Sequence, residues 1–198
     1  MVNRDFITVV SGLPRSGTSL MMQMLAAGGV PPLADGLRVA DESNPRGYFE
    51  FEPVMRLRAD RSWLPLARGK AVKVIHLLLS ELPADGAQEY RVLLMQRPIA
   101  EVLASQRKML ARSGRTGAAI SDEQLARIYE SQLQQAERWL ASSPAFQVLP
   151  INYHALVADP EKLARAIAEF LGGELEIQAM AAAVDPALHR ERSDDREL

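Results

Sequence analysis

Apolar positions along the chain fall into short continuous runs that alternate with longer segments of helical periodicity. The short runs are typical of buried strands in a parallel sheet and lie at 6–10, 71–75, 91–95 and 146–151. The periodic segments predict helices from Leu20 to the glycines at 28–29 and at 53–60, 98–112, 121–140, 159–171 and 176–183. Strands that alternate with helices in this way predict a three-layer α/β/α domain with a mostly parallel central sheet.

Several helix boundaries carry their own capping residues. Ser121 and Gln124 are spaced as a capping box, and Asp159 before Pro160 is typical of a helix start. Residues 30–48 lack periodicity, and a polar connection of this length in a compact domain is usually functional or disordered. The tail from about residue 188 is nearly all charged and is predicted to be flexible.

Size and composition fit a single domain over residues 1–198. Hydrophobic residues make up 47% and charged residues 24%, as in an ordinary soluble protein. The net charge of -2 argues against broad binding to nucleic acid or a membrane surface. The absence of cysteine excludes disulfides, zinc–thiolate sites and thiol nucleophiles. Because no apolar run is long enough for a signal sequence or a membrane span, we expect a cytoplasmic protein.

The junction between the first strand and the first helix carries the most distinctive chemistry. Gly12, Gly17 and Ser19 stand in the register of a phosphate-binding P-loop, G-x-x-x-x-G-K-[ST]. Thr18 occupies the lysine position, and the cation is instead Arg15, inside the loop. A glycine loop of this kind aims backbone N–H groups and a helix N-terminus at an anion. The sequence therefore predicts an anion site beyond the carboxyl ends of the strands.

Three interpretations of this loop differ in function. A tight structural turn would account for the glycines, but not for a proline, an arginine and three hydroxyl residues together. A P-loop kinase acting on a small metabolite would need a lysine on the β/γ phosphates and an acidic strand end for Mg²⁺. The later strands end instead at 96–97 and 151–152, without a carboxylate. A non-catalytic nucleotide-binding module is the further alternative.

The same loop resembles the phosphosulfate-binding loop P-[KR]-S-G-T-[ST] of sulfotransferases that use 3′-phosphoadenosine 5′-phosphosulfate (PAPS). The resemblance implies that the 5′-phosphosulfate is held by Pro14, Arg15, Ser16, Gly17, Thr18 and Ser19. It also implies sulfuryl transfer without a required metal, leaving 3′-phosphoadenosine 5′-phosphate (PAP) as the product. In such a reaction, positive charge lies where the leaving phosphate oxygen becomes negative.

A second segment, at 96–105, resembles the family's signature of a strand ending in arginine with a serine eight residues later in the next helix. The resemblance implies that Arg97 and Ser105 bind the 3′-phosphate of PAPS. Tyr153 lies in a segment similar to Y-E-D-L-x-x-D-P and is implied to lie near the adenine, whereas His154 is expected at the surface. The late R-K-G segment of cytosolic members has no counterpart here beyond two arginines near the C-terminal end, Arg190 and Arg192.

Two residues are candidates for the general base. The segment at 72–83 resembles K-[ST]-H-L-P of cytosolic members, which implies that Lys73 contacts the transferring group and His76 takes the acceptor's proton. Other branches use a glutamate placed after the first helix, and the segment at 44–50 is similar to one found in bacterial members. Its Glu50 lies beside aromatic residues and is slightly preferred to His76.

We therefore expect a PAPS-dependent sulfotransferase that moves a sulfuryl group to a hydroxyl or an amine. Arg15 and Lys73 are expected to stabilise charge on the phosphosulfate. A small-molecule or glycan acceptor is expected to enter beside residues 35–52. No metal, nucleic-acid or membrane partner is expected, and the acceptor's identity and the oligomeric state stay open.

Overall fold

A four-stranded sheet in the order β2-β1-β3-β4 forms the centre of the molecule. The structure is a computed structural model that describes residues 5–38, 40–41, 44, 47–112, 114 and 120–185. The strands are β1 (Ile7–Gly12), β2 (Ala71–Lys73), β3 (Tyr90–Gln96) and β4 (Phe146–Asn152). All three neighbouring pairs run parallel, so the predicted α/β fold with its parallel sheet is confirmed.

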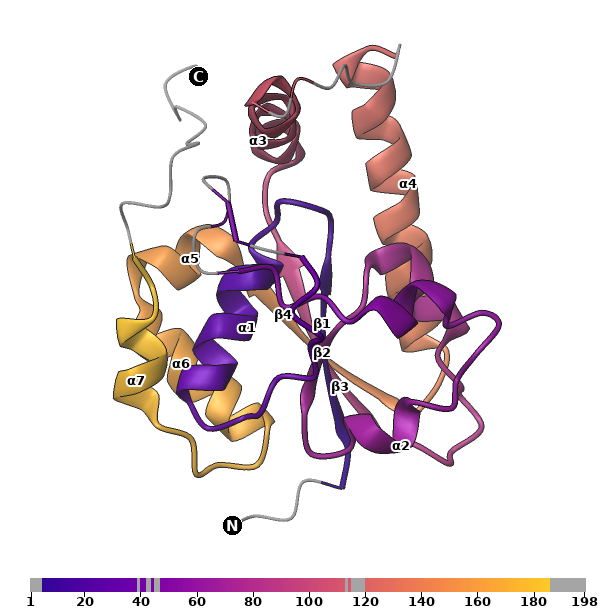
Figure 1. Ribbon diagram of the computed structural model, residues 1–198, viewed down its shortest axis with the longest axis vertical. Helices are drawn as coiled ribbons and strands as arrows, with labels where there is room; N and C mark the ends of the chain where they lie inside the picture. Colours follow the sequence, from indigo (N-terminus) through magenta and orange to yellow (C-terminus); the bar gives the residue numbers. More distant parts are fainter. Residues whose placement is uncertain are drawn as a thin grey trace.

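Helices cover both faces of this sheet (Figure 1). In chain order they are α1 (Thr18–Ala27), η1 (Glu52–Arg56), α2 (Leu64–Ala67), η2 (His76–Glu81), α3 (Ile99–Arg112), α4 (Asp122–Ala141), α5 (Tyr153–Ala158), α6 (Pro160–Phe170) and α7 (Ile177–Ala182), η marking 3-10 helices. One face carries α1, α5, α6 and α7, and the other carries η1, α2, η2 and α4. A third apolar cluster joins α3 to α4 beyond the carboxyl ends of the strands.

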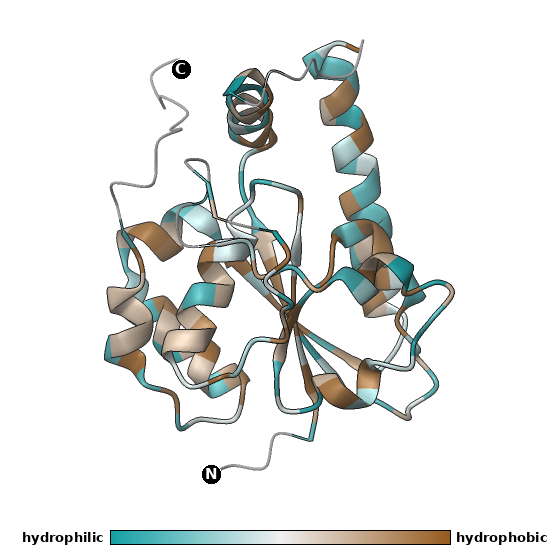
Figure 2. Ribbon diagram, in the orientation of Figure 1, coloured by the Kyte–Doolittle hydropathy of each residue, from teal (hydrophilic) through white to brown (hydrophobic). Residues whose placement is uncertain are grey.

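Successive side chains of the strands supply two separate cores. On β1, Val10 packs beneath α1, α6 and α7, whereas its neighbour Val9 packs beneath α2 and α4. On β3, Leu93 and Val92 divide in the same way. All four are fully buried, as expected for strands that carry helices on both faces. Figure 2 shows apolar positions gathered along the strands and polar positions on the outer turns of α4.

Two elements beside the sheet differ from the prediction. The helix expected at 53–60 is a 3-10 helix over Glu52–Arg56, followed by turns. The strand expected at 71–75 ends at Lys73, because β2 is an edge strand and its pairing with β1 stops there. The chain then enters η2 at His76. Strand length at a sheet edge therefore depends on a distant partner and not on local apolar character.

The predicted helix starts are confirmed. Ser121 accepts a hydrogen bond from the Gln124 N–H, and the Gln124 side chain accepts one from the Ser121 N–H, which completes the capping box. Asp159 caps α6 by accepting from the Lys162 N–H at 3.0 Å. The short helices α2 and α5 were not predicted. Asn152 caps α5 through its side-chain oxygen, so β4 passes directly into a helix.

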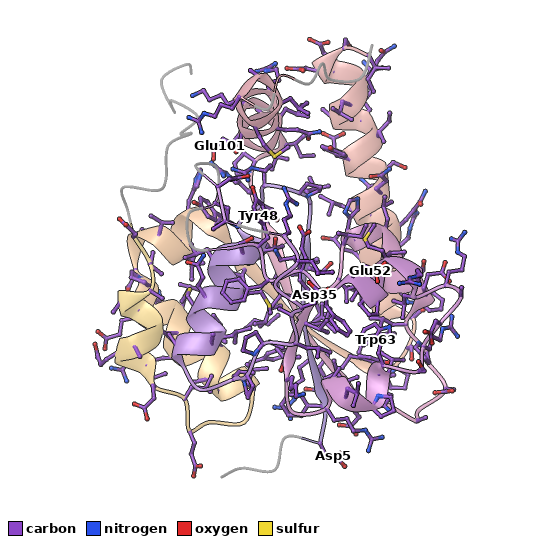
Figure 3. The ribbon with its side chains drawn as sticks, in the orientation of Figure 1. Asp5, Asp35, Tyr48, Glu52, Trp63 and Glu101 are labelled. Carbon is purple, nitrogen blue, oxygen red and sulfur yellow. The ribbon has the colours of Figure 1, made fainter. Side chains whose placement is uncertain are left out.

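The carboxyl ends of the strands meet at one edge of the sheet. There β1 ends at Gly12, β3 at Gln96 and β4 at Asn152, and each is followed by a loop or helix that lines this edge. In Figure 3, Glu101 lies at this end of the molecule and Asp5, which precedes β1, lies at the opposite end. Any ligand that these loops bind is therefore held beyond the carboxyl ends.

Some of the expectations fall outside the described residues. They are the tail from about residue 188, including Arg190 and Arg192, and positions 39, 42–43 and 45–46 of the polar connection. In the part that is described, no helix is both long enough and apolar enough to cross a membrane.

Candidate functional site

A cavity of about 620 Å³ lies at the carboxyl edge of the sheet. Most of the residues singled out from the sequence line it, namely Pro14, Arg15, Gly17, Thr18, Ser19, Glu50, Lys73, Arg97, Ser105 and Tyr153. Ser16 and His76 are not among the lining residues. A volume of this size is typical of a site for a small organic ligand.

The loop after β1 takes its shape from residues with positive φ. Gly12 (φ 146°), Arg15 (φ 71°) and Gly17 (φ 103°) adopt backbone conformations that L-residues rarely take. A Cβ on Gly17 would lie 2.6 Å from Cδ2 of Tyr153, so the close approach of that ring requires glycine. The second glycine of the motif thus serves the contact between the loop and α5 as well as the turn.

The interior of the loop offers donors to an anion. Ser16 is 1% exposed, and its Oγ has no hydrogen-bond partner among the described residues. No side chain of the described chain caps the ten-residue helix α1, which begins at Thr18. Its first N–H groups therefore need partners from elsewhere. A phosphate oxygen would satisfy both kinds of donor, and the helix dipole favours negative charge there.

Two arginines, Arg15 of the loop and Arg97 beside it, are connected by hydrogen bonds. Arg15 Nε donates to Ser105 Oγ at 3.1 Å, and Arg97 Nη1 donates to the Arg15 carbonyl oxygen at 3.2 Å. Burial lowers the pKa of Arg15 from its ordinary value, and the positive charge of Arg97 lowers it further. Two like charges held together in a partly buried site favour the binding of an anion.

Arg97 is held in place by a buried carboxylate. Its Nε donates to Glu101 Oε2 at 2.9 Å, and the two side chains are 7% and 2% exposed. The guanidinium carbon lies 4.5 Å from the centre of the Tyr153 ring, within cation–π distance. His154 Nε2 lies 2.9 Å from Glu101 Oε1, so His154 supports this site and is not simply the surface residue expected.

Glu101 was not singled out from the sequence. Its position four residues after Arg97, at the start of a predicted helix, is the spacing of a helical ion pair and could have suggested the contact. The partner His154 could not have been found in this way. It comes from α5, more than 50 positions later in the chain, and only the fold brings its Nε2 to 3.0 Å from Glu101 Oε2.

Lys73 approaches the same loop from β2. Its Nζ donates to Ser19 Oγ at 2.9 Å and to the Tyr48 carbonyl oxygen. Burial lowers the pKa of the Lys73 ammonium to about 8, although the charge of Glu50 opposes this shift. Lys73 is therefore a partly buried cation beside the first turn of α1, where an incoming anion would stabilise its charged form.

Glu50 lines the cavity and is paired with a cation. Its Oε1 accepts a hydrogen bond from Arg38 Nη1 at 2.7 Å, and both side chains are close to half exposed. The Arg38 guanidinium carbon also lies 3.5 Å from the centre of the Tyr48 ring. The Tyr48 hydroxyl donates to Asp41 Oδ2 at 2.7 Å, and burial raises the pKa of that hydroxyl. The Glu50 carboxylate thus belongs to a chain of contacts that runs through Arg38 and Tyr48 to Asp41.

His76 lies apart from this site. It is buried at the start of η2, where its Nε2 is 2.9 Å from Gln132 Oε1 on α4. Its ring centre lies 6.5 Å from that of Tyr129, also on α4. Of the two candidate bases, only Glu50 lines the cavity.

Metal ligands do not gather at the described strand ends. In residues 5–185, apart from the positions left undescribed, no group of three or more His, Cys, Asp or Glu side chains is placed to hold a metal ion. The strands β3 and β4 end in the amides Gln96 and Asn152. That the reaction needs no metal stays a prediction.

One family model matches part of the chain. This model, described as the sulfotransferase family, matches residues 89–176, from the residue before β3 to the residue before α7. The matched range contains Arg97, Ser105 and Tyr153 and does not include the loop after β1. No curated protein matches the chain.

Solved structures that share the fold include several sulfotransferases. The sulfotransferase domain of the Synechococcus olefin synthase gives a TM-score of 0.57 at 17% identity, covering 94% of this chain and 86% of that one. The sulfotransferase domain of the curacin biosynthetic pathway gives 0.56 at 15% identity, covering 93% and 89%. A sulfotransferase from Mycobacterium tuberculosis gives 0.55 at 18% identity, covering 89% and 70%. At these identities the similarity establishes the fold.

Proposed function

We propose that the chain is a sulfotransferase that transfers a sulfuryl group from PAPS to a hydroxyl or an amine, and the family model that matches residues 89–176 and the shared fold support this proposal. The observation that carries the proposal is the meeting of two motifs that are distant in sequence. Arg15 of the first loop bonds Ser105 of the second motif, and Arg97 of the second motif bonds the Arg15 carbonyl oxygen. A donor with phosphate groups at both its 5′ and 3′ positions accounts for this joint cluster.

The residues present fit such a donor. The unpartnered Oγ of Ser16 and the uncapped start of α1 suit the 5′-phosphosulfate, with Arg15 and Lys73 as its cations. Arg97 and Ser105 then hold the 3′-phosphate, since a guanidinium offers several N–H donors in a fork. Pro14, Gly17, Thr18 and Ser19 shape the loop around the 5′ group, and the Tyr153 ring supports the adenine side.

The proposed transfer needs positive charge at the leaving oxygen and a base at the acceptor. The acceptor oxygen or nitrogen forms a bond to sulfur while the bond between sulfur and the bridging phosphate oxygen breaks. That oxygen keeps the electron pair in PAP, and Arg15 and Lys73 stabilise its charge. Glu50 takes the acceptor's proton, because it is the candidate base that lines the cavity.

A kinase acting on a small metabolite is less well supported. Thr18 stands where a P-loop lysine would contact the β/γ phosphates, and Lys73 reaches the loop from a different strand. The amides Gln96 and Asn152 end the strands where an acidic Mg²⁺ ligand would be needed. A module that binds the nucleotide without catalysis shares the donor site and differs only in lacking turnover.

Release of PAP from PAPS in the presence of an acceptor panel tests the activity. Glu50→Gln removes the proposed base and is expected to lower kcat by about 10²- to 10⁴-fold while PAP binding is kept. Glu161→Gln on α6 is the matched control, because Glu161 is 44% exposed and paired with Arg165, as Glu50 is 43% exposed and paired with Arg38. PAP binding without transfer to any acceptor would leave the binding module as the function.

A further inference from the structure

The cavity is divided along the order of the strands. Its cationic half lies at β1 and β3, where Arg15, Arg97 and Ser105 converge. The other half lies beside β2, where a group of apolar side chains lines the cavity together with polar ones. The apolar side chains come from the polar connection, from η1 and the residue before it, and from the two residues after β2, namely Leu37, Phe51, Val54, Met55, Val74 and Ile75.

Two of these apolar side chains are unusually open to solvent. Leu37 is 72% and Met55 64% exposed, the highest values among the large apolar side chains of the described residues. Both line the cavity, and they come from segments on either side of Glu50 in the sequence. Exposed apolar side chains that line one cavity, and are not scattered singly, mark a surface that an apolar ligand covers.

The polar side chains of this half are already engaged. Asp35 accepts hydrogen bonds from the backbone N–H groups of Leu37 and Glu52. Glu52 Oε2 is paired with Arg56 at 2.6 Å, and Glu50 is paired with Arg38. A sugar would need many free donors and acceptors in this half, because each buried hydroxyl left without a partner weakens binding.

Lys73 and Glu50 lie between the two halves. Lys73 bonds Ser19 at the start of α1, and its pKa responds to the charge of Glu50. A reacting hydroxyl or amine placed beside Glu50 would thus have the cationic half on one side and the apolar side chains on the other. This order fits an acceptor with one polar reacting group on an apolar body.

We propose that the acceptor is an apolar alcohol, phenol or amine whose hydrocarbon part lies against Leu37 and Met55. This inference rests on the sulfotransferase function proposed above. A glycan acceptor is disfavoured, because the polar side chains in this half of the cavity are already hydrogen-bonded or paired. The inference concerns only the β2 half, so it is tested separately from binding of the donor.

The experiment measures binding of straight-chain alcohols to the protein saturated with PAP, by calorimetry. The Kd is expected to fall about fourfold for each methylene added from 1-butanol through 1-hexanol to 1-octanol. The heat capacity change should become more negative along the series as apolar surface is buried. Maltose, the glycan probe, is expected to bind more weakly than 1-octanol.

Single substitutions locate the binding surface. Leu37→Gln and Met55→Gln are each expected to raise the Kd of 1-octanol severalfold while leaving the Kd of PAP unchanged. Leu66→Gln is the matched control, because Leu66 is 60% exposed on α2 and does not line the cavity. All three side chains are exposed, so the variants keep the cores intact.

The outcomes separate this inference from the function on which it rests. A Kd that does not change with chain length, or tighter binding of maltose, overturns the apolar acceptor while PAP binding still supports the sulfotransferase. Equal effects of Leu66→Gln and Met55→Gln also overturn it. Failure of PAP to bind refutes the proposed function first, and the inference falls with it.

Discussion

Arg15 Nε donates a hydrogen bond to Ser105 Oγ at 3.1 Å, although the two residues are 90 positions apart in the chain. One belongs to the loop after β1 and the other to the second turn of α3. The contact makes the two motifs parts of one site at the carboxyl edge of the sheet. A ligand that binds Arg15 therefore also lies beside Ser105.

Arg97→Ala should remove the preference for PAP over AMP. Loss of a charge-assisted contact to the 3′-phosphate is expected to raise the Kd of PAP about 10- to 100-fold while the Kd of AMP changes little. Calorimetric titration of both nucleotides measures the two constants. Arg107→Ala, which removes an exposed cation from the following helix α3, is the control. An unchanged ratio of the two constants refutes the 3′-phosphate assignment.

Glu101→Gln should weaken PAP binding although Glu101 is not assigned a contact with the ligand. The substitution keeps the shape and removes the charge that holds Arg97, and loss of a buried partner costs stability of about 3–5 kcal/mol. A double-mutant cycle separates positioning from general destabilisation. In an Arg97→Ala background, Glu101→Gln is expected to have little further effect on the Kd of PAP. Additive effects would mean that Glu101 acts independently of Arg97.

Gly17→Ala should weaken PAP binding, in addition to the loss of stability that backbone strain at a positive φ causes. The added Cβ would lie 2.6 Å from the Tyr153 ring, so the ring or the loop must move. Gly29→Ala is the matched control, because Gly29 also has a positive φ but its Cβ would meet nothing within 4 Å. Both variants are expected to lose stability of about 1–3 kcal/mol. Only Gly17→Ala should weaken PAP binding. Equal PAP affinities of the two variants would mean that the contact between Gly17 and the Tyr153 ring does not contribute to the PAP site.

Binding of PAP near pH 8 should be accompanied by proton uptake. Burial holds the pKa of Lys73 at about 8, so roughly half of the molecules carry a neutral amine at that pH. A bound anion favours the charged form and raises this pKa, so up to about half a proton is taken up. Calorimetry in buffers of different ionisation enthalpy gives the number. Lys73→Met should abolish the uptake, and uptake that persists in this variant would place the anion away from Lys73.

The sheet and the long helices could be predicted because their determinants are local. The apolar runs through Val9 and Val92 belong to strands buried on both faces, and the capping box at Ser121 fixes the start of α4. The turn after β1 was also predictable, because its glycines and Arg15 lie within one short segment, and that it binds an anion stays a prediction.

The rest of the site depends on contacts that no local pattern contains. The strand β2 stops at Lys73 because its pairing with β1 ends, and this sends His76 into η2 and beneath α4, away from the cavity. The meeting of Glu101 with His154 requires α3 and α5 to be placed by the sheet. Such partners were invisible in the sequence because each looks like an ordinary charged residue of a helix.

We propose that the cavity at the carboxyl edge holds PAPS and not a nucleoside triphosphate with Mg²⁺. Thermal unfolding with PAP and, separately, with ATP and Mg²⁺ tests this proposal most directly. At about 100 times its Kd, PAP is expected to add about 2.7 kcal/mol to the free energy of unfolding and to raise Tm by roughly 5–10 °C. ATP with Mg²⁺ should give a much smaller shift. Stabilisation by ATP with Mg²⁺ and none by PAP would contradict the claim.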